Sequence, residues 1–393
     1  MFYLYGMAGS FFRRFTKRFF VICNVLVAIL FLLGCYAAWF NPTRFWFLGL
    51  LTLAAPYLLL AILLFLLFWL FAKRKLMFIS IITLILTIKP ISKILPFRFS
   101  RSFEIQKMGA GMRVISWNVD NFNLLEYKKN HDVKNGMLDF INKYNPDIAC
   151  FQEMVAADTF VDLNNAYYRK YAFYPLSGFD SALGFKNNFY SYNAKNDFAQ
   201  KQHFGIIIFS KYPIINKKTI SIYPHDYNSI FQFVDIVKVN DTIRIFNIHL
   251  QSLKFSEDDL KYIKDATSKT EIDLGQSKNI LSKLKSGFIK RQKQSNAIKN
   301  EINKSPYPVI VCGDFNDVPN SYAYCTIGKG LKNSFVEKGS GVGRTYSGIS
   351  PTLRIDNIFM DKRFSVEQYT CIQKRMSDHF PVITDIDFAK EKN

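Results

Sequence analysis

The stretch Val-Ile-Val-Cys-Gly-Asp-Phe-Asn at residues 309–316 joins an apolar run to two polar side chains. The β-branched residues at its start predict a buried β-strand. Gly313 permits a tight exit from that strand, and the two-residue spacing of Asp314 and Asn316 directs both side chains to one side. We therefore expect a strand that ends in a carboxylate and an amide facing a common site.

Other short motifs place polar side chains at the ends of apolar runs in the same way. Together they supply carboxylates, amides and imidazoles, but no cysteine ligand and no glycine-rich phosphate loop. Such a set suits a hard, oxygen-ligated metal such as Mg²⁺ and the hydrolysis of a phosphate ester. In chain order these motifs are Ser116-Trp117-Asn118, Gln152-Glu153, Asn247-Ile248-His249, Arg354-Ile355-Asp356 and Ser377-Asp378-His379.

Strand-like runs and one clear helical stretch indicate the class of the region from residue 112 onward. The runs at 231–239 and 242–249 predict a β-hairpin, and helical periodicity is clearest from Leu281 to Ile302. Strands mixed with helices predict a layered α/β domain with a mixed or antiparallel sheet. The expected strands are 112–119, 147–152, 204–210, 231–239, 242–249, 308–312, 354–360 and 381–386.

Two further stretches have unusual compositions. Residues 167–192 are rich in aromatic side chains, and residues 252–286 are polar and rich in lysine. Loops above strand ends commonly shape a substrate site. The aromatic stretch fits a packed wall of the domain, a substrate lip or a membrane-interface contact.

The first hundred residues resemble a membrane region. Residues 19–40 and 45–72 are runs of 22 and 28 residues without a charge, and about 20 apolar residues cross a bilayer core as a helix. The first run is too long for a signal peptide, whose apolar part has roughly 7–15 residues. A third run, 76–88, has only 13 residues. It either completes a short third span through residue 95, with its lysines snorkelling, or forms an interfacial or re-entrant segment.

The basic residues predict an orientation. Four of them precede the first span at residues 13–18, Arg44 alone separates the two long spans, and three follow at residues 73–75. This asymmetry places the N-terminus in the cytoplasm. With three spans the C-terminal domain lies outside the cytoplasm, and with two it lies inside. We favour three, which predicts a multi-pass protein with an extracytoplasmic domain.

Charge and cysteine content set further bounds. Residues 1–110 contain 13 of the 51 basic residues and 1 of the 31 acidic residues. The rest of the chain therefore has 38 basic and 30 acidic residues. The net charge of +20 therefore belongs mostly to the membrane region. The surplus of +8 that remains helps to attract a phosphorylated substrate or an anionic lipid, without by itself indicating nucleic acid. The six cysteines show neither metal-site spacing nor a disulfide framework, so they leave the compartment open.

The six motifs together resemble a known family. Ser-Trp-Asn-Val-Asp, Gln-Glu, Asn-Ile-His-Leu, Gly-Asp-Phe-Asn, Arg-Ile-Asp and Ser-Asp-His-Phe-Pro-Val, in this order, are similar to the endonuclease/exonuclease/phosphatase superfamily, which has the deoxyribonuclease-I-like fold. The resemblance covers residues 112–388. It implies a four-layer α/β sandwich of two packed mixed sheets flanked by helices. Apurinic endonucleases, secreted nucleases, inositol-polyphosphate phosphatases and sphingomyelinases belong to this superfamily.

The expected metal ligands are oxygen donors. Glu153 ends a buried strand and is a natural Mg²⁺ ligand, and the resemblance implies that role. Asn118 is expected to help Glu153 to hold the metal, and its amide orients a ligand carboxylate or contacts a phosphate oxygen. Asp120, two residues on, adds a second metal oxygen, as in the apurinic-endonuclease branch, or forms a turn. Asp378 faces the metal or braces the site. Mn²⁺ is the expected substitute for Mg²⁺.

The expected catalytic residues surround these ligands. The resemblance implies that Asp314 positions or deprotonates the attacking water and that Asn316 holds the phosphate. His249 ends an apolar strand, where it can donate a hydrogen bond to a phosphate oxygen as charge develops. The family's phosphatases, sphingomyelinases and secreted nucleases have histidine there. Apurinic endonucleases tend to have tyrosine, which weakens a DNA-repair interpretation.

A histidine–aspartate pair completes the expected site. His379 is the candidate base or acid, because an imidazole titrates near neutral pH, and Asp356 is its candidate orienter. Arg344, in a glycine-rich loop that lacks the context of a P-loop, is a candidate substrate contact. The remaining histidines match no motif and are expected at surface or packing positions. They are His131, His203 and His225.

The sequence thus predicts a membrane-anchored, Mg²⁺-dependent phosphoesterase that hydrolyses phosphodiester or phosphomonoester bonds by in-line attack of water. Tethering favours a lipid head group as substrate, and an endonuclease or exonuclease acting on DNA or RNA is the alternative. An inactive membrane scaffold is the alternative from another class. We expect residues 1–95 to form an anchor of two to three transmembrane helices, 96–111 a linker and 112–388 the catalytic domain. No protein partner can be inferred.

Overall fold

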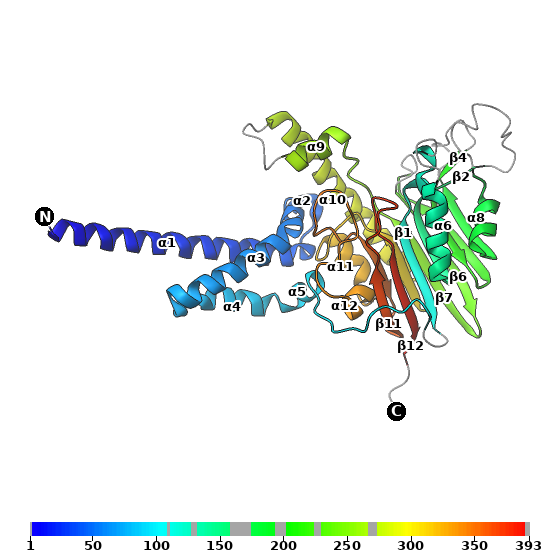
Figure 1. Ribbon diagram of the computed structural model, residues 1–393, viewed down its shortest axis with the longest axis horizontal. Coiled ribbons are helices and arrows are strands. Elements are labelled where there is room, and N and C mark those ends of the chain that lie inside the picture. The colour runs from blue at the N-terminus through cyan, green and yellow to red at the C-terminus, as the bar shows by residue number, and fades with distance from the viewer. Residues whose placement is uncertain are drawn as a thin grey trace. The chain divides into compact units, whose positions relative to one another are not determined.

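The computed structural model describes residues 2–107, 111–126, 132–157, 174–192, 202–223, 229–265 and 273–389, and Figure 1 shows it as a ribbon. The chain divides into two compact units. Met1–Ile94 with Asn320–Tyr322 form the helical unit, and Leu95–Pro319 with Ala323–Asn393 form the sheet unit. Parts of the aromatic stretch 167–192, of the lysine-rich stretch 252–286 and of the expected linker lie outside the described residues, as do His131 and His225.

The helical unit contains two long apolar helices. Among the described residues, Arg14–Cys35 and Leu48–Ala72 are long and apolar enough to cross a membrane. The first expected span ends at Cys35 rather than at residue 40, because the chain turns there into two short helices. The helices are α1 (Phe2–Cys35), η1 (Ala37–Trp39), α2 (Pro42–Phe45), α3 (Leu48–Ala72), η2 (Arg74–Leu76), α4 (Met77–Leu86) and α5 (Ile88–Ile94).

The third apolar segment is broken. Arg74–Leu86 and Ile88–Ile94 are bent by 70° relative to each other, and Thr87 between them has a non-helical conformation. Pro90 explains the break, because a proline ring clashes with the carbonyl four residues earlier, here that of Leu86. The Tyr36 hydroxyl donates a hydrogen bond to that carbonyl. The segment is therefore not one straight helix, and a broken span and a re-entrant loop both fit its shape.

Two six-stranded sheets form the sheet unit. Sheet A has the order β11-β12-β1-β2-β4-β3, and sheet B has the order β5-β6-β7-β8-β10-β9. The pairs β1–β2 and β7–β8 are parallel, whereas the other pairs are antiparallel, so both sheets are mixed. The strands are β1 (Met112–Asn118), β2 (Ile148–Ala157), β3 (Asn187–Tyr192), β4 (Gln202–Ser210), β5 (Ile214–Ser221), β6 (Ile230–Lys238), β7 (Asp241–His249), β8 (Val309–Asp314), β9 (Lys332–Asn333), β10 (Asp356–Met360), β11 (Phe364–Cys371) and β12 (Val382–Phe388).

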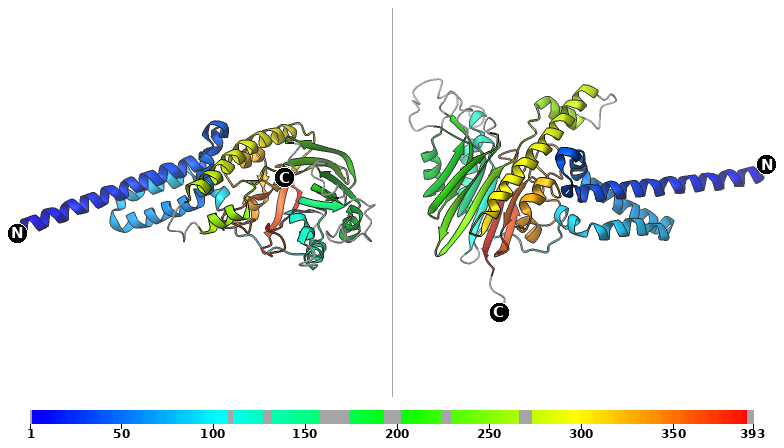
Figure 2. Two further views of the ribbon diagram at one scale, coloured as in Figure 1. Left: turned by 90° about the horizontal axis from the view of Figure 1, so that it is seen from above. Right: turned by 180° about the vertical axis from the view of Figure 1, so that it is seen from behind.

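Helices cover the outer faces of both sheets. In chain order, the helices after residue 112 are η3 (Asp120–Glu126), α6 (Asp132–Tyr144), α8 (Leu176–Leu183), α9 (Glu257–Asp265), α10 (Leu274–Asn303), α11 (Tyr322–Gly328) and α12 (Ser334–Lys338). The views in Figure 2 show α10, in yellow, along the outer side of sheet B. The architecture is an α/β sandwich, which confirms the expected fold class.

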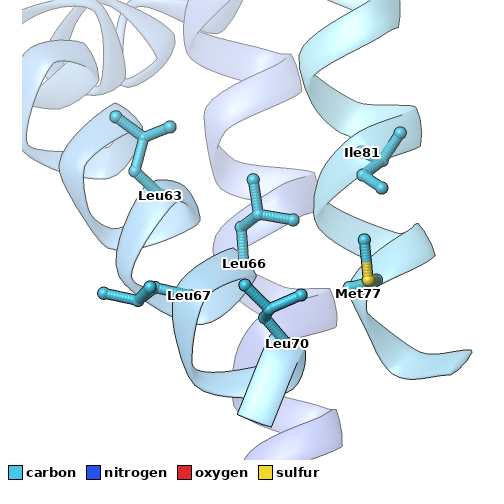
Figure 3. Close-up of a pocket in the computed structure, with 6 residues that line it drawn as sticks. All are labelled: Leu63, Leu66, Leu67, Leu70, Met77 and Ile81. Carbon is cyan, nitrogen blue, oxygen red and sulfur yellow. The ribbon is translucent and has the colours of Figure 1, made fainter. Parts of the chain in front are cut away.

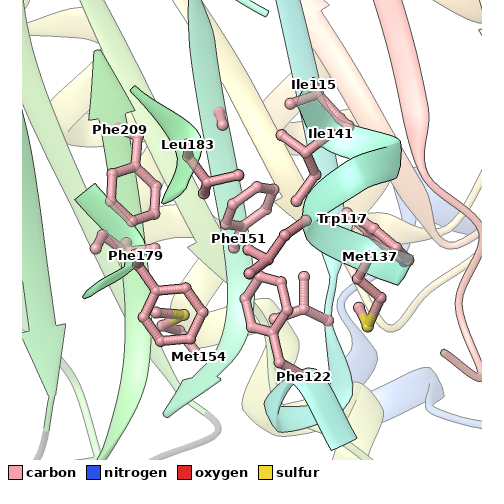
Figure 4. Packing of buried hydrophobic residues seen from close by; sticks show 14 of the residues in the cluster. Ile115, Trp117, Phe122, Met137, Ile141, Phe151, Met154, Phe179, Leu183 and Phe209 are labelled. Carbon is pink, nitrogen blue, oxygen red and sulfur yellow. The ribbon is translucent and has the colours of Figure 1, made fainter. Parts of the chain in front are cut away.

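Three apolar clusters hold these layers together. One fills the space between the sheets and includes Val114 and Ile310. A second packs α6 and α8 on sheet A around Trp117 (Figure 4). The third packs α10 and α11 on sheet B through residues such as Ile298. Alternate residues of β1 belong to different clusters, as expected for a strand buried on both faces.

All eight expected strands occur, each within a few residues of its expected bounds. The expected hairpin is β6–β7, in which Lys238 pairs with Asp241, and the expected helix lies within α10. Four strands were not anticipated: β3, β5, β9 and β11. The edge strand β5 carries mostly exposed residues, and β9 has two residues, so neither shows a strong apolar alternation.

Residues 96–107 follow the surface of the sheet unit. Gly341 N donates to Pro96 O at 3.0 Å, and Arg98 N donates to Ser340 Oγ at 2.9 Å. Farther along, Lys107 pairs with the buried Asp147 at 2.7 Å. Pro96 comes two residues after the end of α5, so little chain separates α5 from the first bond to the sheet unit.

Candidate active site

The ends of the two parallel strand pairs converge at one edge of the sandwich. In sheet A, Asn118 at the end of β1 pairs with Gln152 of β2. In sheet B, His249 at the end of β7 pairs with Asp314 at the end of β8. Asp356 at the start of β10 lies directly opposite Asp314. Because neighbouring parallel strands end at the same sheet edge, the motifs of the sequence meet there.

Glu153 reaches this edge through a β-bulge. The pairing of β2 with β4 shifts register between Phe151 and Met154, and Glu153 has φ +51°. A non-glycine residue in this left-handed region is strained, and such strain is concentrated at functional sites. Asn118 Nδ2 donates to Glu153 Oε1 at 3.0 Å and lies 3.3 Å from Asp314 Oδ2. The amide thus joins a carboxylate of each sheet.

Gly313 is required for the approach of β8 to β7. Its φ is +146°, and a Cβ placed there would lie 2.0 Å from the carbonyl oxygen of Ile248. No other residue fits without moving one of the strands. The glycine therefore allows His249 and Asp314 to end in register side by side.

His249 lies between the carboxylates of the two sheets. Its Nε2 is 3.6 Å from Glu153 Oε1 and 3.5 Å from Asp314 Oδ2, and its side chain is almost fully buried. Asn316, with φ +47°, turns back over the same carboxylate. Its Nδ2 lies 3.2 Å from Asp314 Oδ2 and donates to Leu250 O at 2.9 Å.

His379 and Asp356 form a hydrogen-bonded pair. His379 Nδ1 and Asp356 Oδ2 are 2.9 Å apart, and His379 Nε2 is 3.7 Å from Asp314 Oδ2. The Trp117 indole donates to the carbonyl of His379 at 3.0 Å. Ser377 Oγ donates to the carbonyl of Asn118 at 2.8 Å. These bonds fix the histidine segment against the end of β1.

The charges around this pair shift the pKa values of its members. Burial by itself would lower the pKa of His379, but the carboxylates of Asp356, Asp314 and Asp378 outweigh it and raise that pKa well above its ordinary value. Burial and the nearby Asp356 raise the pKa of Asp314, although His379 and His249 act against this. A protonated His379 beside a buried carboxylate is therefore the favoured state near neutral pH.

Asp120 and Asp378 stand at the exposed rim of the site. Withdrawal from water, with the charges of Asp378 and Glu153, raises the pKa of Asp120 to about 6. Burial, with the charges of Asp378 and Asp314, raises the pKa of Glu153 to about 7. The backbone around Asp378 is bent rather than extended. The side chain of Asp378 can therefore face Asp120 and Glu153, while that of the adjacent His379 faces Asp356.

A left-handed turn places Asp120. Residues 120–123 all have φ between 41° and 55°, a conformation that costs roughly 1–2 kcal/mol for each residue with a side chain. Phe122 holds the turn in place, because it is fully buried against Phe151 and Phe179, with ring centroids 5.8 and 4.9 Å away. The sequence had left a metal oxygen and a turn as alternatives for Asp120, and here it forms a turn that also faces the carboxylates.

Arg344 lies beside the site but is turned toward its own loop. Its Nε donates to Tyr346 O at 2.7 Å, and its guanidinium also donates to Ser347 O. It therefore shapes the loop that carries Tyr346, and direct contact with a substrate remains a prediction. His203, in contrast, stacks on Tyr192 with ring centroids 4.3 Å apart, at the start of β4.

Tyr346 was not anticipated as a site residue. It forms an isolated bridge with His379, and the two rings lie 5.0 Å apart. Burial and the charges of Asp378, Asp314, Glu153 and Asp120 raise its pKa to about 12. A neutral phenol thus faces the carboxylates. The only sequence signal was its place after Gly-Arg-Thr, which does not reveal the approach to His379.

The residues present fit a divalent cation. Several carboxylates raise one another's pKa here, and a cation would offset that repulsion. Asp314, Asp356 and His379 can each offer a ligand atom within 4.8 Å of one another. Because His379 and Asp356 already bond to each other, the oxygen donors of Glu153 and of the rim residues Asp120 and Asp378 are better suited to a hard cation such as Mg²⁺ or Mn²⁺.

Comparisons with known proteins agree with this geometry. The family described as "Endonuclease/Exonuclease/phosphatase family" matches residues 115–379. Residues 17–94 match a family described as "Domain of unknown function (DUF8431)". No protein of the curated set matches the chain.

Solved structures resemble the sheet unit. An endonuclease/exonuclease/phosphatase from Beutenbergia cavernae is 14% identical, with a TM-score of 0.51, and the match covers 71% of this chain and 72% of that one. A structure of the same description from Bacteroides vulgatus is 16% identical, with a TM-score of 0.50, and covers 72% of this chain and 100% of that one. At these identities the likeness concerns the fold alone.

Proposed function

The chain belongs to the endonuclease/exonuclease/phosphatase family and is a hydrolase of phosphate esters, and from this premise we propose that it is a membrane-anchored, Mg²⁺-dependent phosphoesterase. The observation that carries the proposal is the convergence of Glu153, Asp314 and His249 with the His379–Asp356 pair. Each sheet contributes to it, and each side chain lies within 4 Å of another. A protein that only binds would not need a buried acid–base set of this kind.

Asp314 is the proposed acceptor of a proton from the attacking water. It is buried, and its raised pKa makes it a stronger base than an ordinary aspartate. Asn118 and Asn316 each place an amide nitrogen within 3.3 Å of its Oδ2, which holds the carboxylate in one orientation. The alternative base is the His379–Asp356 pair, but the protonated state favoured for His379 suits a donor better.

His379 and His249 are the proposed donors to the phosphate. Asp356 holds the Nδ1 side of His379 at 2.9 Å, so Nε2 is left to face the reacting group. Both imidazoles are buried, and a hydrogen bond from such a donor strengthens as negative charge develops in the transition state. Tyr346 adds a neutral hydroxyl on the same side.

The proposed holders of the cation are Glu153 and Asn118, with Asp120 and Asp378 at the rim. When bound, Mg²⁺ would polarise the phosphate and offset its charge. Asn118 keeps Glu153 oriented through its 3.0 Å hydrogen bond. Mn²⁺ is expected to replace Mg²⁺, because every rim donor is an oxygen.

The substrate is proposed to be a lipid head group or another membrane-associated phosphoester. The helices that can span a membrane, and the short chain between α5 and the sheet unit, support it. Nucleic acid is the second candidate, supported by the family and by the net charge of +8 after residue 110. We propose 112–388 as the catalytic domain, with residues 96–107 as part of its surface, and an extracytoplasmic location.

The test is hydrolysis by the full chain in detergent with Mg²⁺, measured against phosphoinositides, sphingomyelin, single-stranded DNA and RNA. Wild type should release product from at least one class, and Glu153→Ala should not. A nuclease would bind with an affinity that falls steeply with salt, whereas a lipid phosphoesterase would require a lipid surface. Equal rates for wild type and Glu153→Ala would favour the inactive scaffold.

A further inference from the structure

An apolar groove runs between α3 and α4 of the helical unit. It has a volume of about 380 Å³ and is lined only by apolar side chains (Figure 3). This volume lies within the range of roughly 300–1,000 Å³ that is typical of ligand sites. The lining residues are Leu63, Leu66, Leu67 and Leu70 of α3 with Met77 and Ile81 of α4.

The groove ends at a cluster of exposed basic side chains. Leu70 and Met77 flank the turn that carries Lys73, Arg74 and Lys75. Lys17 of α1 lies close enough to Lys73 for the two positive charges to interact. Residues 1–94 contain no aspartate and no glutamate, so no carboxylate of this segment can neutralise the cluster. The positive potential of the cluster therefore attracts an anion from outside this segment.

We propose that this groove and turn form a binding site for an anionic phospholipid. Its phosphate lies at Lys17, Lys73 and Arg74, and one acyl chain lies in the groove along Leu66 and Ile81. A phospholipid is the one occupant that matches both parts, because a soluble anion would leave the groove empty and an apolar partner would leave the charges unmet. The adjoining helices can span a membrane, which places the site among such molecules.

The basic turn assigns the lipid to one leaflet. Positive residues flank the cytoplasmic ends of membrane helices, and anionic lipids attract such residues with about 1 kcal/mol per charge. The site therefore binds lipid of the cytoplasmic leaflet. This inference does not rest on the proposed catalytic function, since no residue of the active site takes part.

The test is native mass spectrometry of the full chain, delipidated in detergent and titrated with dioleoyl phosphatidylglycerol or dioleoyl phosphatidylcholine. We expect phosphatidylglycerol to bind at least tenfold more tightly. Lys73→Gln with Arg74→Gln should weaken its binding about 10- to 30-fold, from the cost per charge. Ile81→Trp, which fills the groove and keeps every charge, should weaken it by a similar factor.

Lys89→Gln with Lys93→Gln is the matched control, since it also removes two charges but in α5. It should leave unchanged the affinity of the protein for the first phosphatidylglycerol molecule that binds. Circular dichroism of each variant must show wild-type helix content. Equal binding of the two lipids, or an equal loss in the α5 control, would overturn the site. Retained binding in Ile81→Trp would overturn the groove as the place of the acyl chain.

Discussion

The side-chain amide of Gln152 donates a 2.7 Å hydrogen bond to Asn247 Oδ1 in the interior of the sandwich. Gln152 belongs to sheet A and Asn247 to sheet B. Asn247 in turn donates to the carbonyls of Phe151 and Ile207 in sheet A, at 2.9 and 2.8 Å. The bond lies directly beneath Glu153 and His249, so it fixes the spacing of the two sheets where the site is built.

Replacing Gln152 by methionine should destabilise the sheet unit by about 1–3 kcal/mol, because Asn247 Oδ1 then has no donor in the interior. Faster amide hydrogen exchange in the β2 and β7 peptides of the full chain would report this loss. Gln373→Met is the control, since Gln373 is exposed and its replacement should change stability by no more than about 0.5 kcal/mol. Equal exchange in the two variants would contradict the structural role of the bond.

Gly313→Ala should cost about 3 kcal/mol or more, because φ is +146° and the added Cβ would meet the Ile248 carbonyl at 2.0 Å. Gly136→Ala is the matched change in α6, where an added Cβ meets nothing within 4 Å. It should stabilise the protein by roughly 0.5–1 kcal/mol, because glycine is unfavourable in a helix. Thermal unfolding of the two variants measures the difference in their stability. Equal stability of the two would mean that β8 can move away from β7 to accommodate the added Cβ.

The sequence allowed the central strands and much of the grouping of the site residues to be predicted, because the motifs of Asn118, His249 and Asp314 each end a strongly apolar run. Once Asn118, His249 and Asp314 stand at strand ends, parallel pairing brings them together. The positions of these strand ends follow from the pattern of apolar residues along the sequence, without knowledge of how the side chains pack. The edge strand β5 was missed because its exposed residues carry no such pattern.

Other parts of the site depend on tertiary packing that local sequence does not encode. The left-handed turn at residues 120–123 contradicts local preference and is held by Phe122 in the core. The approach of Tyr346 to His379 joins segments 33 residues apart through one bridge. Gln152 and Asn247 belong to the quoted motifs, but the sequence does not reveal that their hydrogen-bond partners lie in the opposite sheet.

Without a cation, the stability of the folded protein should fall as the pH rises, and Mg²⁺ should restore it. The pKa of Glu153 is about 7 in the folded protein against an ordinary value of 4.5. The folded state therefore binds more protons between these values, and stability falls as the pH rises through that window, by up to about 3 kcal/mol. In chelator the melting temperature should drop from pH 5 to pH 7.5, and Mg²⁺ should restore it.

Glu153→Gln is the control for this effect. It keeps an acceptor for Asn118 and removes the titrating group, so the pH dependence in chelator should become shallower. Hydrolysis should be lost in the same variant, and chelator should abolish hydrolysis by wild type. A fully active Glu153→Gln protein, or full activity in excess chelator, would show that the metal site is misplaced.

His379→Ala and Asp356→Ala should each lower the turnover number by roughly 10²–10⁴-fold. The double variant should be little worse than His379→Ala alone, because groups that act as a unit are not additive. Multiplicative losses would show that Asp356 does not serve His379.

The pH profile gives a second test of the pair. Asp356 raises the pKa of His379, so the protonated form persists to higher pH, and its stabilising interaction is lost as the pH rises through that raised pKa. Asp356→Asn should therefore move the alkaline limb of the turnover profile to lower pH. An unchanged limb would mean that His379 is not the titrating donor.

The broken third segment runs back alongside the first helix. Ser80 of α4 donates to Asn24 of α1 at 3.3 Å, and the Tyr36 hydroxyl donates to the carbonyl of Leu86. The start of α4 thus meets the middle of α1, and its end meets the end of α1. Although α4 has only 10 residues, or about 15 Å of helix, the chain has returned to the far end of the first span by residue 86.

The sheet unit should therefore lie on the side of the membrane opposite the N-terminus. Four basic residues before the first span and three after the second predict an N-terminus in the cytoplasm, so a third crossing would put the sheet unit outside it. Protease added to sealed right-side-out vesicles should then remove the sheet unit, and inside-out vesicles should protect it. Digestion only in inside-out vesicles would mean that α4 and α5 form a re-entrant loop and that the enzyme faces the cytoplasm.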